Sequence, residues 1–303
     1  CPWIQCFQGI IRFWLDFSTK KSVKMVISAA GMAICLLCGS CGGKEESRGA
    51  LEMEGTAGRK AEEASRQVWE EQEERKQQEA QERAARLESY RTCSSGTRIE
   101  DVLSEEETDS LFYASEIPAE VFRRMNGVSY VENDDIALAD LRYLRMLYVG
   151  FDGEPHVGEM VANVQIADTL LEIFRTLYDN GYQIEKMRLI DDYGGDDDAS
   201  CLDNNTPCFN YRVVEGSTRL SRHAYGMAID INPVYNPYVT YENGVEHISP
   251  EGSEPYADRS ADFPHKIGGE GELCLELFEE QGFTWGGNWR TLKDYQHFQM
   301  SGT

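Results

Sequence analysis

Positive charge is scarce in this sequence. Of its 303 residues, 29 are lysine or arginine and 53 are aspartate or glutamate, which gives a formal net charge of −24. Binding to nucleic-acid phosphates needs clustered Lys and Arg side chains. We therefore expect no nucleic-acid partner, and the same acidity would be repelled by an anionic membrane surface.

A hydrophobic run long enough to span a membrane is also missing. The uncharged segment 25–43, "MVISAAGMAICLLCGSCGG", follows the basic "KKSVK", and its strongly apolar part of about 12 residues is shorter than the about 20 that a transmembrane helix needs. The segment resembles a bacterial lipoprotein signal, with cleavage before Cys41 and lipid on its thiol. A plain signal peptide or an uncleaved anchor is the alternative. We expect residues 1–43 to be a signal segment and the protein to be exported, at the outer face of the cytoplasmic membrane or in the cell wall.

Closely spaced Cys-x-x-Cys pairs are absent after residue 41. Only four of the nine cysteines lie in that part, and two of them, Cys201 and Cys208, flank the short stretch "CLDNNTPC". In an oxidising compartment they would be able to form a disulfide. Two free, half-buried thiols are an equally good interpretation.

Large apolar residues are sparse between residues 44 and 92. This charged segment consists almost entirely of good helix formers, and in its stretch 59–90 only Val68, Trp69 and Leu87 are large and non-polar before the closing tyrosine. A helix that is polar all round is a solvated spacer and not a core element. We expect residues 44–92 to be a helical or disordered stalk, residues 93–140 to be a small lead-in region, and residues 141–303 to be the functional domain.

Alternating strand-like and helical patterns within residues 141–303 predict an α+β fold. The best helix pattern covers residues 163–181, with Asn163 as its expected N-cap and Gly181 as its stop. A second, shorter helix is expected to end at Gly282. Strands are expected at residues 141–151, 186–193 and 209–216.

The stretch "LSRHAYGMAIDINP", residues 220–233, contains a histidine, a glycine and an aspartate in a mostly apolar context. His223 and Asp230 are seven residues apart, so an unbroken strand would direct them to opposite faces. Gly226 lies between them and allows the backbone to bend at little steric cost. We therefore expect a bend, followed by a half-buried strand, that turns both side chains toward one ion.

A third candidate ligand lies near the C-terminus, in "KDYQHFQM". Asp294 precedes His297 by three residues, a spacing that places both on one face of a helix or turn. Two histidines and an aspartate are ligands typical of a catalytic zinc whose fourth position is left for water, and a nearby carboxylate suits a general base. By spacing alone, a core histidine and a capping aspartate are equally good interpretations.

These motifs resemble those of a known family. "SRHAYGMAID" is similar to the S-x-H-x-x-G-x-A-x-D signature of the M15 metallopeptidases, the D-alanyl-D-alanine carboxypeptidase and L-alanyl-D-glutamate endopeptidase group that acts on bacterial cell walls. "GFTWGGNW" followed by "DYQHFQ" resembles the second motif of that family, and "NNTPCFNYR" resembles a segment of its carboxypeptidase-like branch. The resemblance extends over residues 140–300. It implies a Hedgehog/DD-peptidase-like α+β fold, in which a small antiparallel sheet carries zinc and helices cover the opposite side.

The resemblance also implies roles for individual residues. Zn²⁺ would be bound by His223, Asp230 and His297, and Asp294 would be the general base. Arg212 would hold substrate or stabilise the oxyanion, a task that suits a guanidinium. Nearby arginines compete for this role: Arg219, Arg222 and Arg259.

Other residues of the motif regions are expected to be less central. Asn288 stands where many relatives carry an aspartate. This departure puts in doubt one contact that supports the zinc ligands, but none of the ligands themselves. Trp285 and Trp289 either line the cleft or belong to the core. The three remaining histidines are not expected to contact the metal: His156, His247 and His265.

The resemblance and the expected export together favour a zinc-dependent peptidase of peptidoglycan stem peptides. A D,D-carboxypeptidase is the first choice. An L-alanyl-D-glutamate-type endopeptidase and a non-catalytic zinc-containing wall-binding module are the alternatives. The stem peptide is the expected partner, with the membrane reached through the N-terminal lipid anchor or signal segment.

Overall fold

The computed structural model describes residues 46–214, 216–269 and 271–301. The chain divides into two compact units, residues 1–77 and 78–303. The predicted signal segment and the lipidation of Cys41 lie outside the described residues. Among the residues that are described, no helix combines the length and the apolar character needed to cross a membrane.

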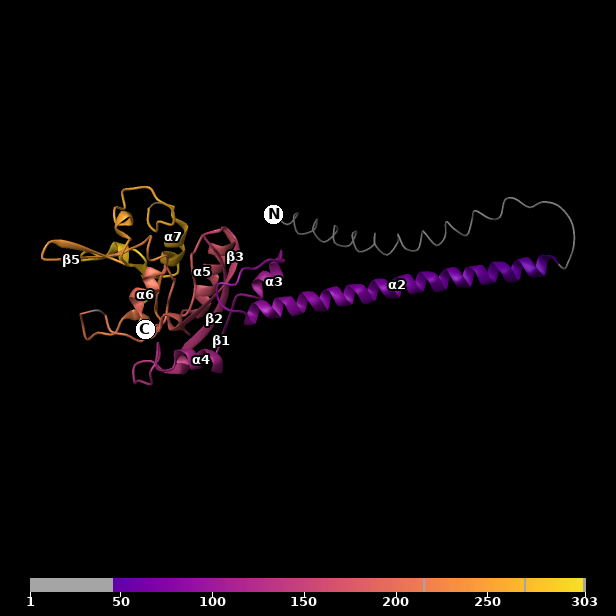
Figure 1. Ribbon diagram of the computed structural model, residues 1–303, viewed down its shortest axis with the longest axis horizontal. Helices are drawn as coiled ribbons and strands as arrows, with labels where there is room; N and C mark the ends of the chain where they lie inside the picture. The colour runs from indigo at the N-terminus through magenta and orange to yellow at the C-terminus, as the bar shows by residue number, and fades with distance from the viewer. Residues whose placement is uncertain (1–45, 215, 270, 302–303) are drawn as a thin grey trace, which may run out of the picture. The chain divides into compact units, whose positions relative to one another are not determined.

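The charged segment forms one long helix, α2 (Glu46–Thr92), as its composition of helix formers favours. Its two large apolar residues in mid-helix, Val68 and Trp69, are 52% and 62% exposed. The helix is thus exposed in its middle (Figure 1), and its role as a stalk stays a prediction. In its last turns Leu87 and Tyr90 pack against a cluster that includes Ile99.

The first sheet contains β1 (Tyr113–Ser115), β2 (Leu141–Val149) and β3 (Pro155–Asn163), in the antiparallel order β1-β2-β3. The strand predicted at residues 141–151 is confirmed as β2. β3 was not predicted from the sequence. In the structure its residues from Val157 onward are buried. Since β1 pairs with β2, the lead-in region shares a sheet with the domain that follows it. This region also contains α3 (Glu105–Asp109) and α4 (Ala119–Met125).

The predicted amphipathic helix is confirmed as α5 (Ala167–Asp179), which packs on the first sheet. Its buried residues follow the three-four spacing of the sequence pattern: Ala167, Leu170, Ile173, Phe174 and Leu177. The N-cap position is occupied by Ile166 and not by Asn163. Asn163 ends β3 instead, and its side-chain Oδ1 accepts a hydrogen bond from the backbone of Gln165 at 3.0 Å. Gly181 has φ of 68° and stops the helix as expected.

Two predicted strands are wrong. Residues 186–193 contain only an isolated bridge, Lys186 to Asn205, before a short 3₁₀ helix, η2 (Ile190–Tyr193). Residues 209–216 contain only a bridge from Val213 to Leu220 among the residues described there. Met187 and Leu189 of the first segment and Phe209 of the second are buried, whereas Val213 is 47% exposed. The backbone groups of both segments bond to scattered partners and not to one neighbouring strand. The N–H of Phe209, for example, donates to Val161, whereas that of Asn210 donates to His223.

Two further small antiparallel sheets complete the α+β fold. The second sheet has the order β4-β9-β7, and the third has the order β6-β5-β8. The remaining elements are β4 (Ala228–Asp230), β5 (Tyr238–Glu242), β6 (Val245–Ser249), β7 (Thr284–Trp285), β8 (Lys293–Asp294), β9 (His297–Gln299), α6 (Asp197–Leu202) and α7 (Leu273–Glu280), with 3₁₀ turns η1 (Leu138–Asp140), η3 (Arg222–Tyr225), η4 (Glu254–Tyr256) and η5 (Gly286–Asn288). The second predicted helix is thus confirmed as α7, followed by Gly282 with φ of 87°.

A shared core joins the first and second sheets. Phe174 of α5, Phe278 of α7 and Phe298 of β9 are almost completely buried in it. The rings of Phe278 and Phe298 stack with their centroids 4.4 Å apart. Cys201 and Cys208 are free, as in the two-thiol interpretation, but both are buried and not half-buried.

Candidate metal centre

His223 lies in a tight turn that the sequence specifies locally. Ser221 caps η3, and its Oγ accepts a hydrogen bond from the backbone N–H of His223 at 3.3 Å. Gly226 ends the turn with φ of 63°, and a Cβ at this position would lie 2.7 Å from the backbone nitrogen of Asn163. Both the left-handed conformation and this close approach require glycine. The predicted bend at Gly226 is therefore confirmed.

Asp230 and His297 are brought together by strand pairing. β4 runs antiparallel to β9, and its register places Asp230 directly opposite His297. All three residues of β4 are buried, so the prediction of a half-buried strand is wrong. The reason is that the chain packs on both faces of this short strand, which puts the carboxylate inside the molecule.

The donor atoms of the three predicted ligands converge. Nε2 of His223 lies 3.1 Å from Oδ2 of Asp230 and 3.3 Å from Nδ1 of His297, and this Nδ1 lies 2.9 Å from Oδ1 of Asp230. All three are buried: His223 and Asp230 are each 3% exposed, and His297 is 6% exposed. A tetrahedral zinc with ligand bonds of about 2.0–2.1 Å separates its ligands by about 3.3 Å. The spacing, together with the imidazole and carboxylate donor set, fits a single zinc-sized cation.

Hydrogen bonds on the far side of each imidazole direct the correct nitrogen inward. Nδ1 of His223 lies 2.6 Å from the carbonyl oxygen of Cys208, and Nε2 of His297 lies 3.1 Å from Oε1 of Gln299. Because both acceptors bind N–H groups, these nitrogens carry the protons. When a cation is bound, Nε2 of His223 and Nδ1 of His297 would therefore present their lone pairs to it, as hydrogen bonds to the other ring nitrogen of metal-bound histidines generally ensure.

The electrostatics of the centre suit a bound cation. Burial raises the pKa of Asp230, but the neighbouring His223 and His297 outweigh it and hold that pKa well below its ordinary value. Burial likewise lowers the pKa of His297, yet its hydrogen bond to Asp230 and the charges of Asp230 and Asp294 raise the pKa to about 9. Without a metal, positive charge at this point is supplied by a proton on His297.

Asp294 lies on β8, separated from β9 by a bend at residues 295–296. β8 is held opposite Tyr238 of β5, and Gly286 fits so tightly against it that a Cβ would lie 2.5 Å from the carbonyl oxygen of Asp294. Oδ1 of Asp294 is buried without a hydrogen-bond partner in the described part of the chain. Burial and the charge of Asp230 raise the pKa of Asp294 to about 7, which is the range of an effective general base at neutral pH.

Arg212 is held by an ion pair with Asp197 of α6, with Nη2 and Oδ2 2.5 Å apart. Its Nε is buried and has no hydrogen-bond partner among the described residues. Burial lowers the pKa of Arg212, but the charges of Asp197 and Asp230 outweigh it and raise the pKa. Its competitor Arg259 is engaged elsewhere, because its guanidinium donates to four oxygens of the loop region: those of Tyr235, Asn236, Tyr256 and Ile267.

The other histidines lie outside the cluster that could hold a metal. His156 bonds to Asp152 and to the carbonyl of Gly96, whereas His247 is exposed on β6. His265 stacks on Phe151 with 3.8 Å between ring centroids.

The two tryptophans have different positions. Trp285 is a core residue whose Nε1 donates to the carbonyl of Tyr295, and Trp289 contacts the ring of His297 at a centroid distance of 5.3 Å. Asn288, the position that departs from the family pattern, is exposed and donates to Glu279 on the surface.

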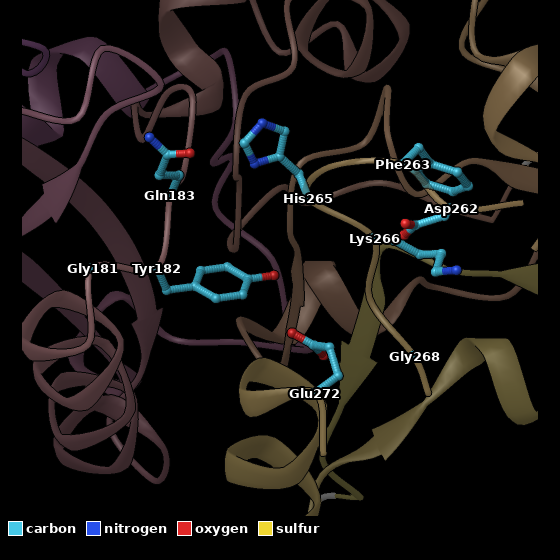
Figure 2. A pocket seen from close by; sticks show the side chains of 9 residues that line it. All are labelled: Gly181, Tyr182, Gln183, Asp262, Phe263, His265, Lys266, Gly268 and Glu272. Carbon is cyan, nitrogen blue, oxygen red and sulfur yellow. The ribbon is translucent and has the colours of Figure 1, made fainter. Parts of the chain in front are cut away.

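A cavity of about 440 Å³ lies apart from this cluster of ligands and is lined by none of the five predicted site residues. Figure 2 shows Tyr182 and Glu272 on one side of it, with Phe263 and Lys266 on the other. Both carboxylate oxygens of Glu272 are occupied in capping α7. Lys266 donates to the carbonyl oxygens of Arg259 and Ala261.

Sequence reasoning missed the residues that support the centre. Gln299 follows His297 by two residues, a spacing that puts both on one face of a strand, so this partner had a readable signal. The backbone carbonyl of Cys208 had none, because any residue supplies a carbonyl. Asp197 is one of three consecutive aspartates, and nothing in the sequence distinguishes the one that reaches Arg212.

The centre has the features of a metalloprotein site with two histidines and one aspartate as ligands. Residues 215–300 match the model of an M15 peptidase family described as D-alanyl-D-alanine carboxypeptidase. This match confirms the M15 resemblance for the segment that contains His223, Asp230, Asp294 and His297, and it supports a peptidase. It is shorter than the 140–300 span inferred from the motifs and does not include Arg212. Neither the curated proteins nor the solved structures contain a match to the chain.

Proposed function

We propose that this protein is a zinc-dependent peptidase of bacterial peptidoglycan stem peptides. The activity we favour is removal of the terminal D-alanine. The observation that carries the proposal is the convergence of His223, Asp230 and His297, with donor atoms 2.9–3.3 Å apart and each imidazole fixed from behind. The family match to a D-alanyl-D-alanine carboxypeptidase supports the substrate class.

His223, Asp230 and His297 are the three residues that would hold the zinc. When bound, zinc supplies a Lewis acid and makes a water molecule acidic enough to react near neutral pH. Asp294 accepts the proton from the attacking water and later delivers it to the leaving amine. Its buried, unpartnered Oδ1 and its raised pKa suit both transfers. Arg212 stabilises the negative charge that develops on the peptide carbonyl oxygen.

The proposed cellular location follows from the substrate. Peptidoglycan lies outside the cytoplasmic membrane, and the N-terminal segment resembles a lipoprotein signal with Cys41 as its lipidation site. We propose that α2 then separates the peptidase from this anchor. Labelling of cells with an alkyne fatty acid tests the anchor, since Cys41→Ser should abolish incorporation into the protein.

Digestion of purified muropeptides by the zinc-loaded protein, followed by mass spectrometry, tests the activity. A D,D-carboxypeptidase releases D-alanine, whereas an endopeptidase separates L-alanine from the rest of the stem. Release of neither product at any tested pH would contradict the proposal. Stoichiometric binding of stem peptide without cleavage would instead favour the wall-binding module.

Asp294 distinguishes catalysis from binding. Asp294→Ala and the isosteric Asp294→Asn should retain one zinc per chain and lose at least about 10²-fold in kcat, the scale of general-base catalysis. A suitable control is Asp258→Asn, because this aspartate is exposed and its carboxylate accepts hydrogen bonds from the neighbouring Ser260. Full activity in both Asp294 variants would remove this residue from the mechanism.

A further inference from the structure

We propose that Gln299 is the positioning residue that selects which nitrogen of His297 binds the metal. The inference rests on the proposed metal site, but not on the reaction that the site performs. It assigns a role to a side chain that neither the spacing of the motifs nor the family match identified.

The geometry begins with strand β9. Residues 297 and 299 are two apart on this strand and so share a face, and Oε1 of Gln299 lies 3.1 Å from Nε2 of His297. The backbone of Gln299 is fixed from both sides, since it pairs with Ala228 of β4 and with Thr284 of β7. The Oγ1 of Thr284 also donates to the carbonyl oxygen of Gln299 at 3.2 Å. The side chain of Gln299 therefore extends from a backbone position that is fixed in the central strand of the sheet.

The chemistry follows from the two tautomers of a neutral imidazole. An acceptor at Nε2 favours the tautomer with hydrogen on Nε2, so that the lone pair is on Nδ1. That nitrogen lies 2.9 Å from Asp230 and 3.3 Å from the ring of His223. The opposite tautomer would direct an N–H into the centre and would block a ligand position.

Other contacts do not perform this selection. Trp289 lies 5.3 Å from the ring of His297, and such a contact restrains the ring plane but accepts no proton. For His223 the equivalent acceptor is the backbone carbonyl of Cys208, which substitution does not remove. Gln299 is thus the side chain whose change would affect the tautomer of one ligand and leave the other intact.

Two variants separate positioning from packing. Gln299→Leu keeps a similar volume and removes the acceptor, and we expect zinc affinity to fall about 10–100-fold, as for other outer-shell partners of metal ligands. Gln299→Glu keeps an oxygen acceptor and should hold zinc within about threefold of wild type. The matched control is Thr284→Val, which removes the hydrogen bond to the Gln299 carbonyl but leaves its side chain in place. Zinc affinity is measured by competition with a chromogenic chelator on the whole protein.

Nitrogen-15 NMR of the zinc-loaded, histidine-labelled protein gives a readout that a packing role would not change. Wild type and Gln299→Glu should show His297 with zinc on Nδ1 and hydrogen on Nε2, and Gln299→Leu should show loss or exchange of that pattern. Metal on Nε2 in the wild type would overturn the inference, even if the leucine variant failed to fold. Unchanged zinc affinity in a folded Gln299→Leu would also overturn it. Because neither readout involves peptide cleavage, absence of peptidase activity would contradict the proposed function and leave this inference intact.

Discussion

Asp230 and His297 lie opposite each other on β4 and β9, with Oδ1 and Nδ1 2.9 Å apart and both side chains almost completely buried. They are 67 positions apart in the chain. Strand pairing fixes the distance between their backbones, and the neighbouring pair of Ile229 and Phe298 anchors the same register in the core. Each short strand thus carries one candidate metal ligand and one core residue side by side, which couples the geometry of the candidate site to the stability of the fold.

Removal of a ligand should abolish tight metal binding. We expect one zinc per chain in the wild type and a loss of affinity greater than about 10²-fold in His223→Ala or Asp230→Asn, since even outer-shell changes cost 10–100-fold. Elemental analysis after dialysis against a weak chelator measures the content. His247→Ala is the matched control, because this histidine is exposed on β6. Equal zinc content in all variants would place the metal elsewhere.

Zinc affinity should rise with pH. His297 has a pKa of about 9 in the metal-free protein, above its ordinary value of 6.5, so the stability that its proton contributes is complete below pH 6.5 and is lost as the pH rises through 9. Zinc must displace this proton, so between these pH values its affinity should increase about tenfold per pH unit and then level off. Chelator competition from pH 6 to 10 measures the slope. A flat profile between pH 7 and 9 would contradict a protonated His297.

Asp197 should support activity without holding metal. It is the ion-pair partner of Arg212, so Asp197→Asn removes the charge that orients the guanidinium. A hydrogen bond to a charged group contributes about 1.5–3 kcal/mol, and we expect kcat/KM to fall about 10–100-fold with zinc content unchanged. Asp179→Asn is the control, since it breaks the exposed pair with Arg175 on α5. Equal activity of the two variants would remove Arg212 from the catalytic role proposed for it.

Phe298 should link folding to metal binding. It is fully buried between His297 and Gln299 on β9, and its ring stacks on that of Phe278 with the centroids 4.4 Å apart. Phe298→Ala should lower the free energy of unfolding by about 3–5 kcal/mol, because burial is lost and a cavity remains, and should weaken zinc binding as well. Urea denaturation of the metal-free and metal-loaded forms measures both effects. A loss below about 1 kcal/mol would show that the register does not depend on this ring.

Local signals in the sequence predicted several elements correctly. The apolar spacing of α5 and α7 is set by one face of each helix, and Gly181 and Gly226 are required where the backbone turns left-handed. The strands expected at residues 186–193 and 209–216 are wrong because the backbone there forms only isolated bridges, with no continuous partner strand among the described residues. β3 was missed because it is buried along most of its length and therefore does not alternate clearly.

The sequence by itself determined the identity of the candidate ligands, because a histidine, a bend-forming glycine and an aspartate in a short motif carry the chemistry in their side chains. Only the tertiary structure decided which backbone and side-chain groups support them. The opposition of Asp230 and His297, the pairing of Arg212 with Asp197 and the hydrogen bond from His297 to Gln299 all depend on how β4, β9 and α6 are placed in space. Contacts between residues far apart in the chain are selected by the packing of the whole core, and no local pattern encodes them.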